Sequence, residues 1–288
     1  MTAAGFPPPD PATVILDPPH PSAPWRAPEP SIDEPYSSAL YLPRPEVRWG
    51  LGAAALSLLG IAAPLGILIV LIVSGLLPYS EPIAFAGALG SYLVALIVPF
   101  VAARHRGLGR MRDDFGLRIR WIDVPIGIGL GLGVRFTLFF VLFALAPLLQ
   151  DAQGNLALAP DPLWFALSSV FIPVAVAPIV EEILCRGLIM RAVRNRILRS
   201  GVPTQARRTA AIILSIVIST LVFAALHGHQ MVNVATVVTL GTTTILAGLV
   251  HGWIATKTGR LGAAIVSHAT LNATAVLLLL VAQAAGIA

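Results

Sequence analysis

The sequence contains few charged residues and almost no cysteine. Of its 288 residues, 11% are charged and 56% are hydrophobic, and the mean hydropathy is +0.83. Soluble domains carry about 25% charged residues, so this composition argues against a soluble class and indicates an integral membrane protein. The single cysteine, Cys185, excludes an internal disulfide. Its place within a glutamate-containing motif favours a small buried thiol over a nucleophile.

Several familiar catalytic and binding motifs are also missing. The sequence has no HExxH zinc-protease pattern, no Cys-His cluster and no GxSxG nucleophile elbow. The glycine run GIGLGLGV, residues 127–134, is followed by neither a strand pattern nor Lys-Ser/Thr, so it predicts close helix packing rather than a phosphate loop. No internal repeat of about 20–50 residues is evident.

The first 48 residues differ in composition from the rest. They hold 13 of the 24 prolines, few long apolar residues, and more acidic than basic residues. Such a segment cannot bury enough surface to fold, so residues 1–48 are predicted to be a disordered, Pro-rich cytoplasmic tail. Alternatively, this segment is a Pro-rich ligand to which another protein docks. The segment lacks a basic region followed by an apolar one, which argues against a signal peptide.

The rest of the chain, residues 49–288, is predicted to be an all-α, polytopic transmembrane helix bundle. About 20 apolar residues cross a bilayer, and seven runs are long enough. They lie near 50–77, 82–103, 122–148, 163–190, 209–227, 233–254 and 261–285. Aromatic residues suited to the membrane interface mark the ends of these runs, namely Trp49, Tyr79, Trp121, Trp164 and Trp253.

Arginine is concentrated in alternate connections between these runs. Segments 104–120 and 191–208 carry six arginines each, whereas 149–162 carries no basic residue and 78–81 contains only Glu81 as a charge. The positive-inside rule therefore predicts a protein of the cell membrane with its N-terminus in the cytoplasm and, with seven spans, its C-terminus on the outer side. The net charge of +5 then reflects orientation, and no nucleic-acid partner is predicted.

Ionisable side chains lie inside several of the predicted spans. Each costs roughly 2.5–3.5 kcal/mol at the bilayer centre, so a chain that keeps several normally uses them. Partners spaced i, i+4 share one helix face, and three such pairs predict one buried polar cluster. The pairs are Glu182 with Arg186, Phe223 with His227, and His268 with Asn272.

The two glutamates are predicted to have different roles. Glu182 and Arg186 can form an intrahelical ion pair, whereas Glu181 points about 100° away and cannot use that geometry. Because a structural pair needs only one acid, Glu181 is the candidate general base that takes a proton from water. Glu182 and Arg186 are then supporting residues.

The histidines have two alternative roles. In the first, His227 holds a water beside Glu181, while His268 and Asn272 direct two donors to one point, as an oxyanion hole requires. In the second, Glu181, His227 and His268 bind a divalent metal such as zinc, with water in the fourth position. No other cofactor is predicted.

Four further residues are predicted to lie around the cluster or at the membrane interface. Phe223 is expected to pack against the pocket and shape it. His229 and His251 lie at the ends of runs and are expected to be interfacial. Arg135 lies near the centre of its span and is expected to pair inward with a carboxylate or with helix-end carbonyls, in support of the cluster.

At these motifs the chain resembles the CAAX-processing and bacteriocin-processing family of intramembrane proteases, which includes the type II CAAX prenyl endopeptidases. The family's EExxxR, FxxxH and HxxxN patterns are matched in order by EEILCR, FAALH and HATLN. The stretch GLVHGWIATKTGRLGAAIVSHATLN is similar to the family's approach to its last motif. The resemblance covers about residues 160–285, which is therefore the expected protease-like core.

The resemblance implies a bundle of seven or eight helices with a cavity open to the cytoplasmic leaflet. It implies an endopeptidase that cleaves a membrane-associated or lipidated protein or peptide. If the matching residues keep the roles they have in the family, Glu181 and His227 would position and activate water, and His268 and Asn272 would stabilise the oxyanion. Glu182 and Arg186 would order the site. Family members have been described both as metalloproteases and as metal-free glutamate enzymes, and the sequence leaves this open.

Two other classes of function remain as alternatives. A membrane transporter for protons or metal ions would also keep carboxylates and histidines in its spans, although no internal symmetry is evident. A non-catalytic bacteriocin-immunity or scaffold protein would keep the cluster for packing alone.

Overall fold

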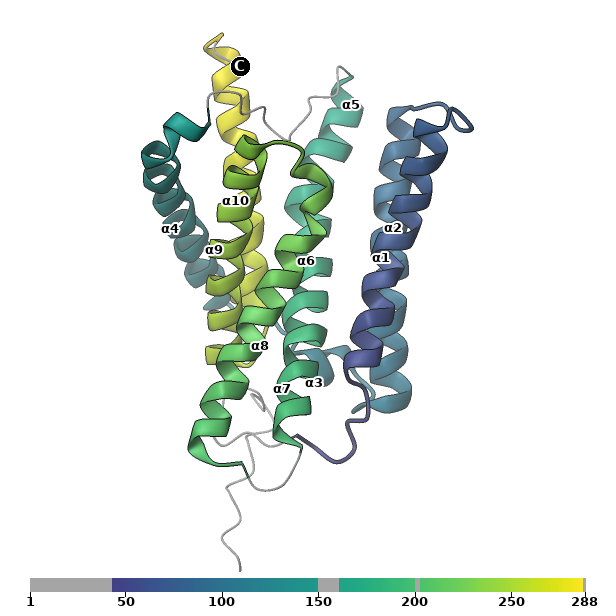
Figure 1. Cartoon of the computed structure of the whole chain (residues 1–288), viewed down its shortest axis with the longest axis vertical. Helices are drawn as coiled ribbons and strands as arrows, with labels where there is room; N and C mark the ends of the chain where they lie inside the picture. The colour runs from purple at the N-terminus through teal and green to yellow at the C-terminus, as the bar shows by residue number, and fades with distance from the viewer. Residues whose placement is uncertain (1–42, 150–160, 200–202, 287–288) are drawn as a thin grey trace, which may run out of the picture.

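A computed structural model describes residues 43–149, 161–199 and 203–286, and these residues form helices with no β-strand among them (Figure 1). Seven helices are long and apolar enough to cross a membrane, which confirms the predicted all-α, multi-pass class. They are α1 (Leu51–Val73), α2 (Glu81–Arg106), α4 (Asp123–Ala144), the continuous helix Pro162–Leu198, α8 (Gln205–Leu226), α9 (Val234–Thr258) and α10 (Gly262–Ala284). Residues 1–42 of the predicted tail lie outside the described residues.

The continuous helix Pro162–Leu198 contains two π-helical stretches. In order it comprises α5 (Pro162–Trp164), η2 (Phe165–Val176), α6 (Ala177–Glu182), η3 (Ile183–Ile189) and α7 (Met190–Leu198), of which η2 and η3 are π-helical. The glutamates of the EExxxR motif end α6, and its arginine lies in η3. Because π-helical turns occur frequently at functional sites, their position beside the EExxxR motif supports a functional role for this part of the helix.

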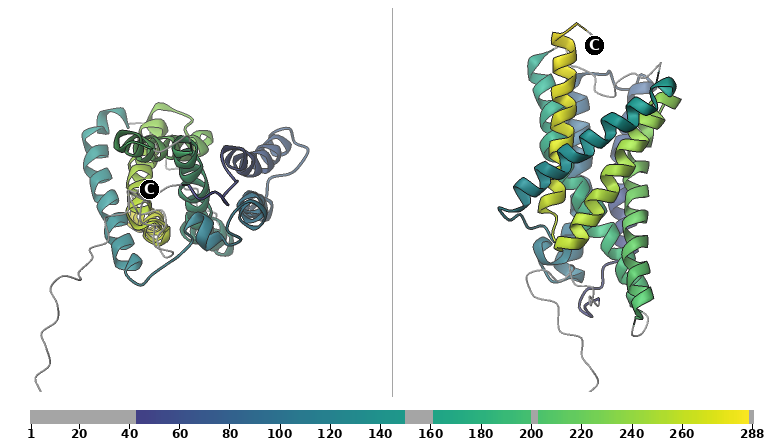
Figure 2. Two further views of the ribbon diagram at one scale, coloured as in Figure 1. Left: turned by 90° about the horizontal axis from the view of Figure 1, so that it is seen from below. Right: turned by 90° about the vertical axis from the view of Figure 1, so that its left-hand side faces the viewer.

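Helix α10 packs against α4, α9, η2 and α6, whereas α1 packs against α2, η3 and α7. Figures 1 and 2 show the α1–α2 hairpin on one side of the molecule and α4 on the other, where α4 runs obliquely across α10. Three short elements complete the described fold, namely α3 (Met111–Phe115), η1 (Ala146–Leu148) and η4 (Gly228–Gln230). The α2–α4 connection and the α7–α8 hairpin lie at the same end of the bundle, opposite the C-terminus (Figure 1).

Glycines bring α4 close to α10, as the glycine run predicts. A Cβ atom on Gly127 would lie 2.5 Å from the Val266 Cβ atom, and one on Gly131 would lie 2.6 Å from the Ser267 carbonyl oxygen. These positions therefore exclude a larger side chain. As a result, α4 packs directly against the turn of α10 that carries Ser267.

The segment before α1 is ordered from residue 43, so the predicted disorder is wrong for residues 43–48. Val47 and Trp49 are buried, and the amide of Arg48 donates to the Arg106 carbonyl at 2.7 Å. The Trp49 indole N–H donates to Asp114 Oδ1 at 2.7 Å, and burial raises the pKa of this carboxyl. Trp49 is therefore a core residue rather than the interfacial one predicted, because indole burial and this bond outweigh the cost of ordering the segment.

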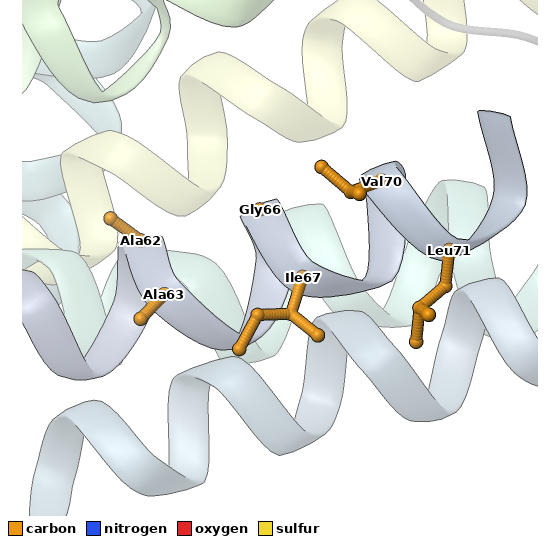
Figure 3. Close-up of a pocket in the computed structure, with 6 residues that line it drawn as sticks. All are labelled: Ala62, Ala63, Gly66, Ile67, Val70 and Leu71. Carbon is orange, nitrogen blue, oxygen red and sulfur yellow. The ribbon is translucent and has the colours of Figure 1, made fainter. Parts of the chain in front are cut away.

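The remaining predicted interfacial aromatics stay partly or largely accessible. Trp121 is 93% exposed, Tyr79 is 63% exposed and Trp253 is 47% exposed, while Trp164 is of intermediate exposure. A hollow on the outer face of the bundle follows α1 (Figure 3). It is lined only by apolar residues, namely Ala62, Ala63, Gly66, Ile67, Val70 and Leu71. This hollow therefore offers no polar group for chemistry.

Candidate active site

Glu182 is the centre of a buried polar cluster that joins three helices. Its Oε1 atom accepts hydrogen bonds from Arg186 Nη1 at 3.1 Å, His251 Nδ1 at 3.0 Å and His268 Nδ1 at 3.2 Å. The side chains of Glu182, Arg186 and His251 are fully buried. Because a carboxylate can only accept, both imidazole Nδ1 atoms must carry a proton in this arrangement.

Arg186 forms the ion pair that its spacing from Glu182 predicts. Its Nη2 atom donates to the Gly248 carbonyl at 3.1 Å, and its guanidinium carbon lies 4.7 Å from the centre of the Phe223 ring. The Phe223 ring also packs on His227 and His268, with ring centres 4.9 and 5.5 Å apart. Phe223 is therefore a packing residue of the site, as predicted.

His251 is part of the cluster, so its predicted interfacial position is wrong. Its Nδ1 atom donates to Glu182, and its Nε2 atom can accept from Ser267 Oγ at 3.1 Å. The physical reason is close packing of α9 against α8, where a Cβ on Gly248 would lie 2.6 Å from Thr220. The small residues flanking His251 are the sequence signal for this buried face. His229, by contrast, is exposed near the end of α8.

Glu181 is buried beside Glu182 and meets a different set of side chains. Its Oε1 atom accepts a hydrogen bond from the Tyr92 hydroxyl at 2.8 Å. Its Oε2 atom accepts none from the described residues and faces His268 Nε2 at 3.8 Å. Glu181 and His268 retain 7% and 4% exposure, whereas Glu182 retains none. Tyr92 belongs to α2 and was missed because nothing in its apolar run distinguishes it.

His227 and Asn272 are anchored to backbone carbonyls near the cluster. His227 Nδ1 donates to the Phe223 carbonyl at 2.9 Å, within its own helix terminus. Asn272 Nδ2 donates to the Pro173 carbonyl at 2.7 Å, which connects α10 to η2. His268 is therefore the histidine whose imidazole nitrogen lies opposite Glu181, whereas the sequence analysis gave that position to His227.

Arg135 points toward α10, as expected, but its partners differ from those predicted. Its Nη2 atom donates to the Leu271 carbonyl at 2.6 Å, and its Nε atom donates to Thr274 Oγ1 at 3.1 Å. Leu271 lies within α10 rather than at its end, and none of the described carboxylates pairs with this guanidinium. Arg135 therefore supports the α10 backbone next to Asn272.

A metal ion implied by the family resemblance does not fit the converging side chains as they stand. Ligand atoms of Glu182, His251 and His268 lie within 4.8 Å of one another, and this is a different set from Glu181, His227 and His268. Glu182 Oε1 already accepts bonds from both imidazoles and from the Arg186 guanidinium. A cation placed there would be repelled by this guanidinium. The set fits a hydrogen-bonded ion cluster better than a metal centre.

The cluster lies near the turn that joins α9 to α10. His251 is seven residues before the end of α9, and His268 is six residues after the start of α10. With a rise of about 1.5 Å per residue, the cluster lies about 10 Å from the turn that joins these helices. This turn is at the same end as the arginine-rich connections (Figure 1).

Comparison with known proteins identifies the part of the chain that carries this cluster. Residues 162–274 match the family model described as type II CAAX prenyl endopeptidase, Rce1-like. Comparisons of the chain with curated proteins and with solved structures gave no match. The matched segment contains Glu181, Glu182 and both cluster histidines, but not Tyr92. Residues 162–274 of this multi-pass membrane protein are therefore similar to the Rce1-like type II CAAX prenyl endopeptidase family, which confirms the resemblance seen in the motifs.

Proposed function

We propose that the chain is an intramembrane endopeptidase that hydrolyses a peptide bond of a membrane-associated or lipid-modified protein or peptide. The observation that carries the proposal is the pairing of Glu181 Oε2 with His268 Nε2 at 3.8 Å within an Rce1-like segment. This separation is too long for a direct hydrogen bond, but one water molecule can bridge it. The described residues give Glu181 Oε2 no hydrogen-bond donor, as is also true of Glu182 Oε2, but Glu181 Oε2 is the one that faces His268 Nε2.

In the proposed reaction, Glu181 is the general base. Its carboxylate removes one proton from water as the water oxygen bonds to the carbonyl carbon of the peptide, and the same proton later passes to the leaving amine. His268 donates through Nδ1 to Glu182, so in the neutral imidazole Nε2 is free to accept the second water hydrogen. This gives His268 the water-orienting role that the sequence analysis assigned to His227.

Asn272 is the proposed donor to the oxyanion. It lies one helical turn after His268, and its amide uses one N–H on the Pro173 carbonyl, which leaves the second N–H for substrate. His227 packs on the Phe223 ring beside His268 and is proposed to line the peptide-binding side of the site. Glu182 accepts from His268 Nδ1 and is itself paired with Arg186, so the two residues are proposed to hold the His268 ring in place.

The proposed access route is from the arginine-rich end of the bundle. With the N-terminus and these connections in the cytoplasm, a substrate anchored in the cytoplasmic leaflet would approach a site about 10 Å from the α9–α10 turn. A lipid-modified or membrane-associated segment is the substrate class that this depth suits.

Cleavage by purified protein tests the proposed function. Native protein and Glu181→Ala, each in liposomes, would be incubated with a library of peptides with and without an attached lipid chain, and products would be identified by mass spectrometry. We expect cleavage by the native protein and none by the variant. Proton or metal-ion flux through the native protein, with no cleavage of any peptide, would favour the transporter alternative and contradict the proposal.

Chelation separates the glutamate mechanism from a metal-dependent one. We expect cleavage to survive exhaustive chelation, because Arg186 competes with any cation at Glu182. Asn272→Ala should lower kcat more than it raises KM, since a lost oxyanion donor costs about 10²–10³ in kcat in other enzymes. His268→Ala should also lower kcat more than it raises KM, because it removes the imidazole that orients the attacking water. Loss of activity on chelation, restored by zinc, would refute the metal-free role of these residues.

A further inference from the structure

The α1–α2 hairpin lies outside the matched segment, yet it contributes a hydrogen bond to the candidate active site. The Tyr92 hydroxyl of α2 donates to Glu181 Oε1 at 2.8 Å, across 89 residues of sequence. Tyr92 packs against the buried core that includes Val180 and Leu184, on either side of the two glutamates. Its position is therefore fixed by packing as well as by the bond.

The hairpin itself holds Tyr92 in a defined place. Ser57 Oγ of α1 donates to the Ala95 carbonyl of α2 at 2.7 Å, and a Cβ on Gly60 would lie 3.4 Å from the Ala95 Cα atom. These contacts occur one turn from Tyr92, where α1 and α2 pack closely. The phenol is thus presented to α6 by a tightly packed pair of helices.

The Tyr92 bond distinguishes the two oxygens of the Glu181 carboxylate. A phenol has one O–H donor, and this donor is used on Oε1. Oε2 is then the oxygen directed toward His268 Nε2. We propose that Tyr92 is a positioning residue that holds Glu181 with Oε2 turned toward His268, so that the α1–α2 hairpin is part of the active site. This inference rests on the proposed function.

Kinetics of Tyr92→Phe test the positioning role, because the substitution keeps the ring and removes only the hydroxyl. We expect kcat to fall about tenfold with KM within about twofold, the size of effect expected for one hydrogen bond to a charged group. Tyr79→Phe is the matched control, since Tyr79 donates to Glu81 at 3.1 Å on the exposed surface and should keep native kinetics. Native kcat in Tyr92→Phe, or a loss carried entirely by KM, would overturn the inference.

A double-mutant cycle shows whether the hydroxyl acts through Glu181. Glu181→Asp keeps a carboxylate but withdraws it by one methylene, so adding Tyr92→Phe in that background should change kcat by less than about twofold. A tenfold effect of Tyr92→Phe in both backgrounds would overturn the inference.

A second cycle does not depend on activity and so separates this inference from the proposed function. The melting temperatures of native protein, Tyr92→Phe, Glu181→Ala and the double variant would be compared in detergent. We expect Tyr92→Phe to lower the melting temperature of native protein and to have no effect once Glu181 is removed. An equal drop in both backgrounds would overturn the positioning contact, whereas absence of cleavage by native protein would refute the proposed function alone.

Discussion

Glu181 and Glu182 are adjacent residues of the same type with different surroundings. Consecutive helical residues point about 100° apart, so the two carboxylates have different surroundings, although His268 lies near both. Glu182 is fully buried and accepts bonds from a guanidinium and two imidazoles, whereas Glu181 accepts one bond and keeps some exposure. The first arrangement suits structural support and the second suits proton transfer.

Arg186→Ala tests the supporting half of this division. Removal of the guanidinium leaves Glu182 as a buried carboxylate without its ion-pair partner, and breaking a buried pair costs on the order of 3–5 kcal/mol. We expect a clearly lower melting temperature in detergent. Arg112→Ala is the control, because Arg112 is 60% exposed, lies 3.8 Å from Asp113, and belongs to a class of pairs worth about 0–1 kcal/mol. Equal melting temperatures for the two variants would show that the Glu182–Arg186 pair contributes no stability.

His251→Ala tests the residue whose position the sequence analysis misjudged. The substitution removes one of three donors to Glu182 Oε1 and leaves the Ser267 hydroxyl without its imidazole partner, and an unsatisfied buried group costs about 1–3 kcal/mol. We expect a lower melting temperature, with little change for His229→Ala, whose bond is to its own exposed turn. A His251→Ala protein as stable as His229→Ala would place His251 outside the supporting network.

At the residue scale, helical spacing predicted contacts between residues of one helix but not contacts between residues of different helices. The i, i+4 spacing of Glu182 and Arg186 predicted their contact, because both lie on one helix. His251 and Tyr92 reach the cluster from separate helices, and their contacts depend on how closely those helices pack. The small residues around His251 signalled such packing, whereas Tyr92 had no comparable signal.

At the element scale, apolar runs predicted seven spans but not where the longest helix ends. The predicted span stopped at residue 190, where arginines begin, yet α7 continues to Leu198. Arg191 is buried and donates to the carbonyls of Asp114 and Gly259 at 3.0 and 2.9 Å. Gly259 caps the C-terminus of α9, where a cation is favourable. Such tertiary partners cannot be read from hydropathy.

Gly248→Ala tests the close approach of α9 to α8. The added Cβ would lie 2.6 Å from Thr220 Cγ2, and the shift needed would disturb the Gly248 carbonyl that accepts from Arg186. We expect loss of both stability and cleavage. Gly241→Ala is the control in the same helix, because a Cβ atom on Gly241 would have no neighbouring atom within 4 Å. This variant should have native stability or be more stable by about 0.5–1 kcal/mol. Similar melting temperatures for the two variants would contradict the close packing.

At the scale of the whole molecule, the arginine-rich connections lie at the same end of the bundle (Figure 1). The order of spans and their basic connections predicted this arrangement, because alternate connections of a bundle must lie at the same end. The ordered segment before α1 could not be predicted in this way, since its contacts with Arg106 and Asp114 form only after the helices assemble.

Orientation in the membrane can be measured by labelling single cysteines in intact cells. Arg110→Cys and Tyr79→Cys place exposed thiols at opposite ends, and the native Cys185 is buried. With an impermeant maleimide, we expect Tyr79→Cys to react in intact cells and Arg110→Cys to react only after permeabilisation. The reverse pattern would place the arginine-rich end outside and contradict the proposed access from the cytoplasm.

The central claim is that Glu181 takes the proton from water, and the most direct test is the kcat of folded Glu181→Gln on a peptide that the native protein cleaves. Glutamine keeps the shape of the side chain and removes the basic oxygen that faces His268. A general base contributes about 10²–10⁴ in rate, so we predict a fall of at least about 10² with the melting temperature close to native. A folded Glu181→Gln protein that cleaves the peptide at the native rate would contradict the account.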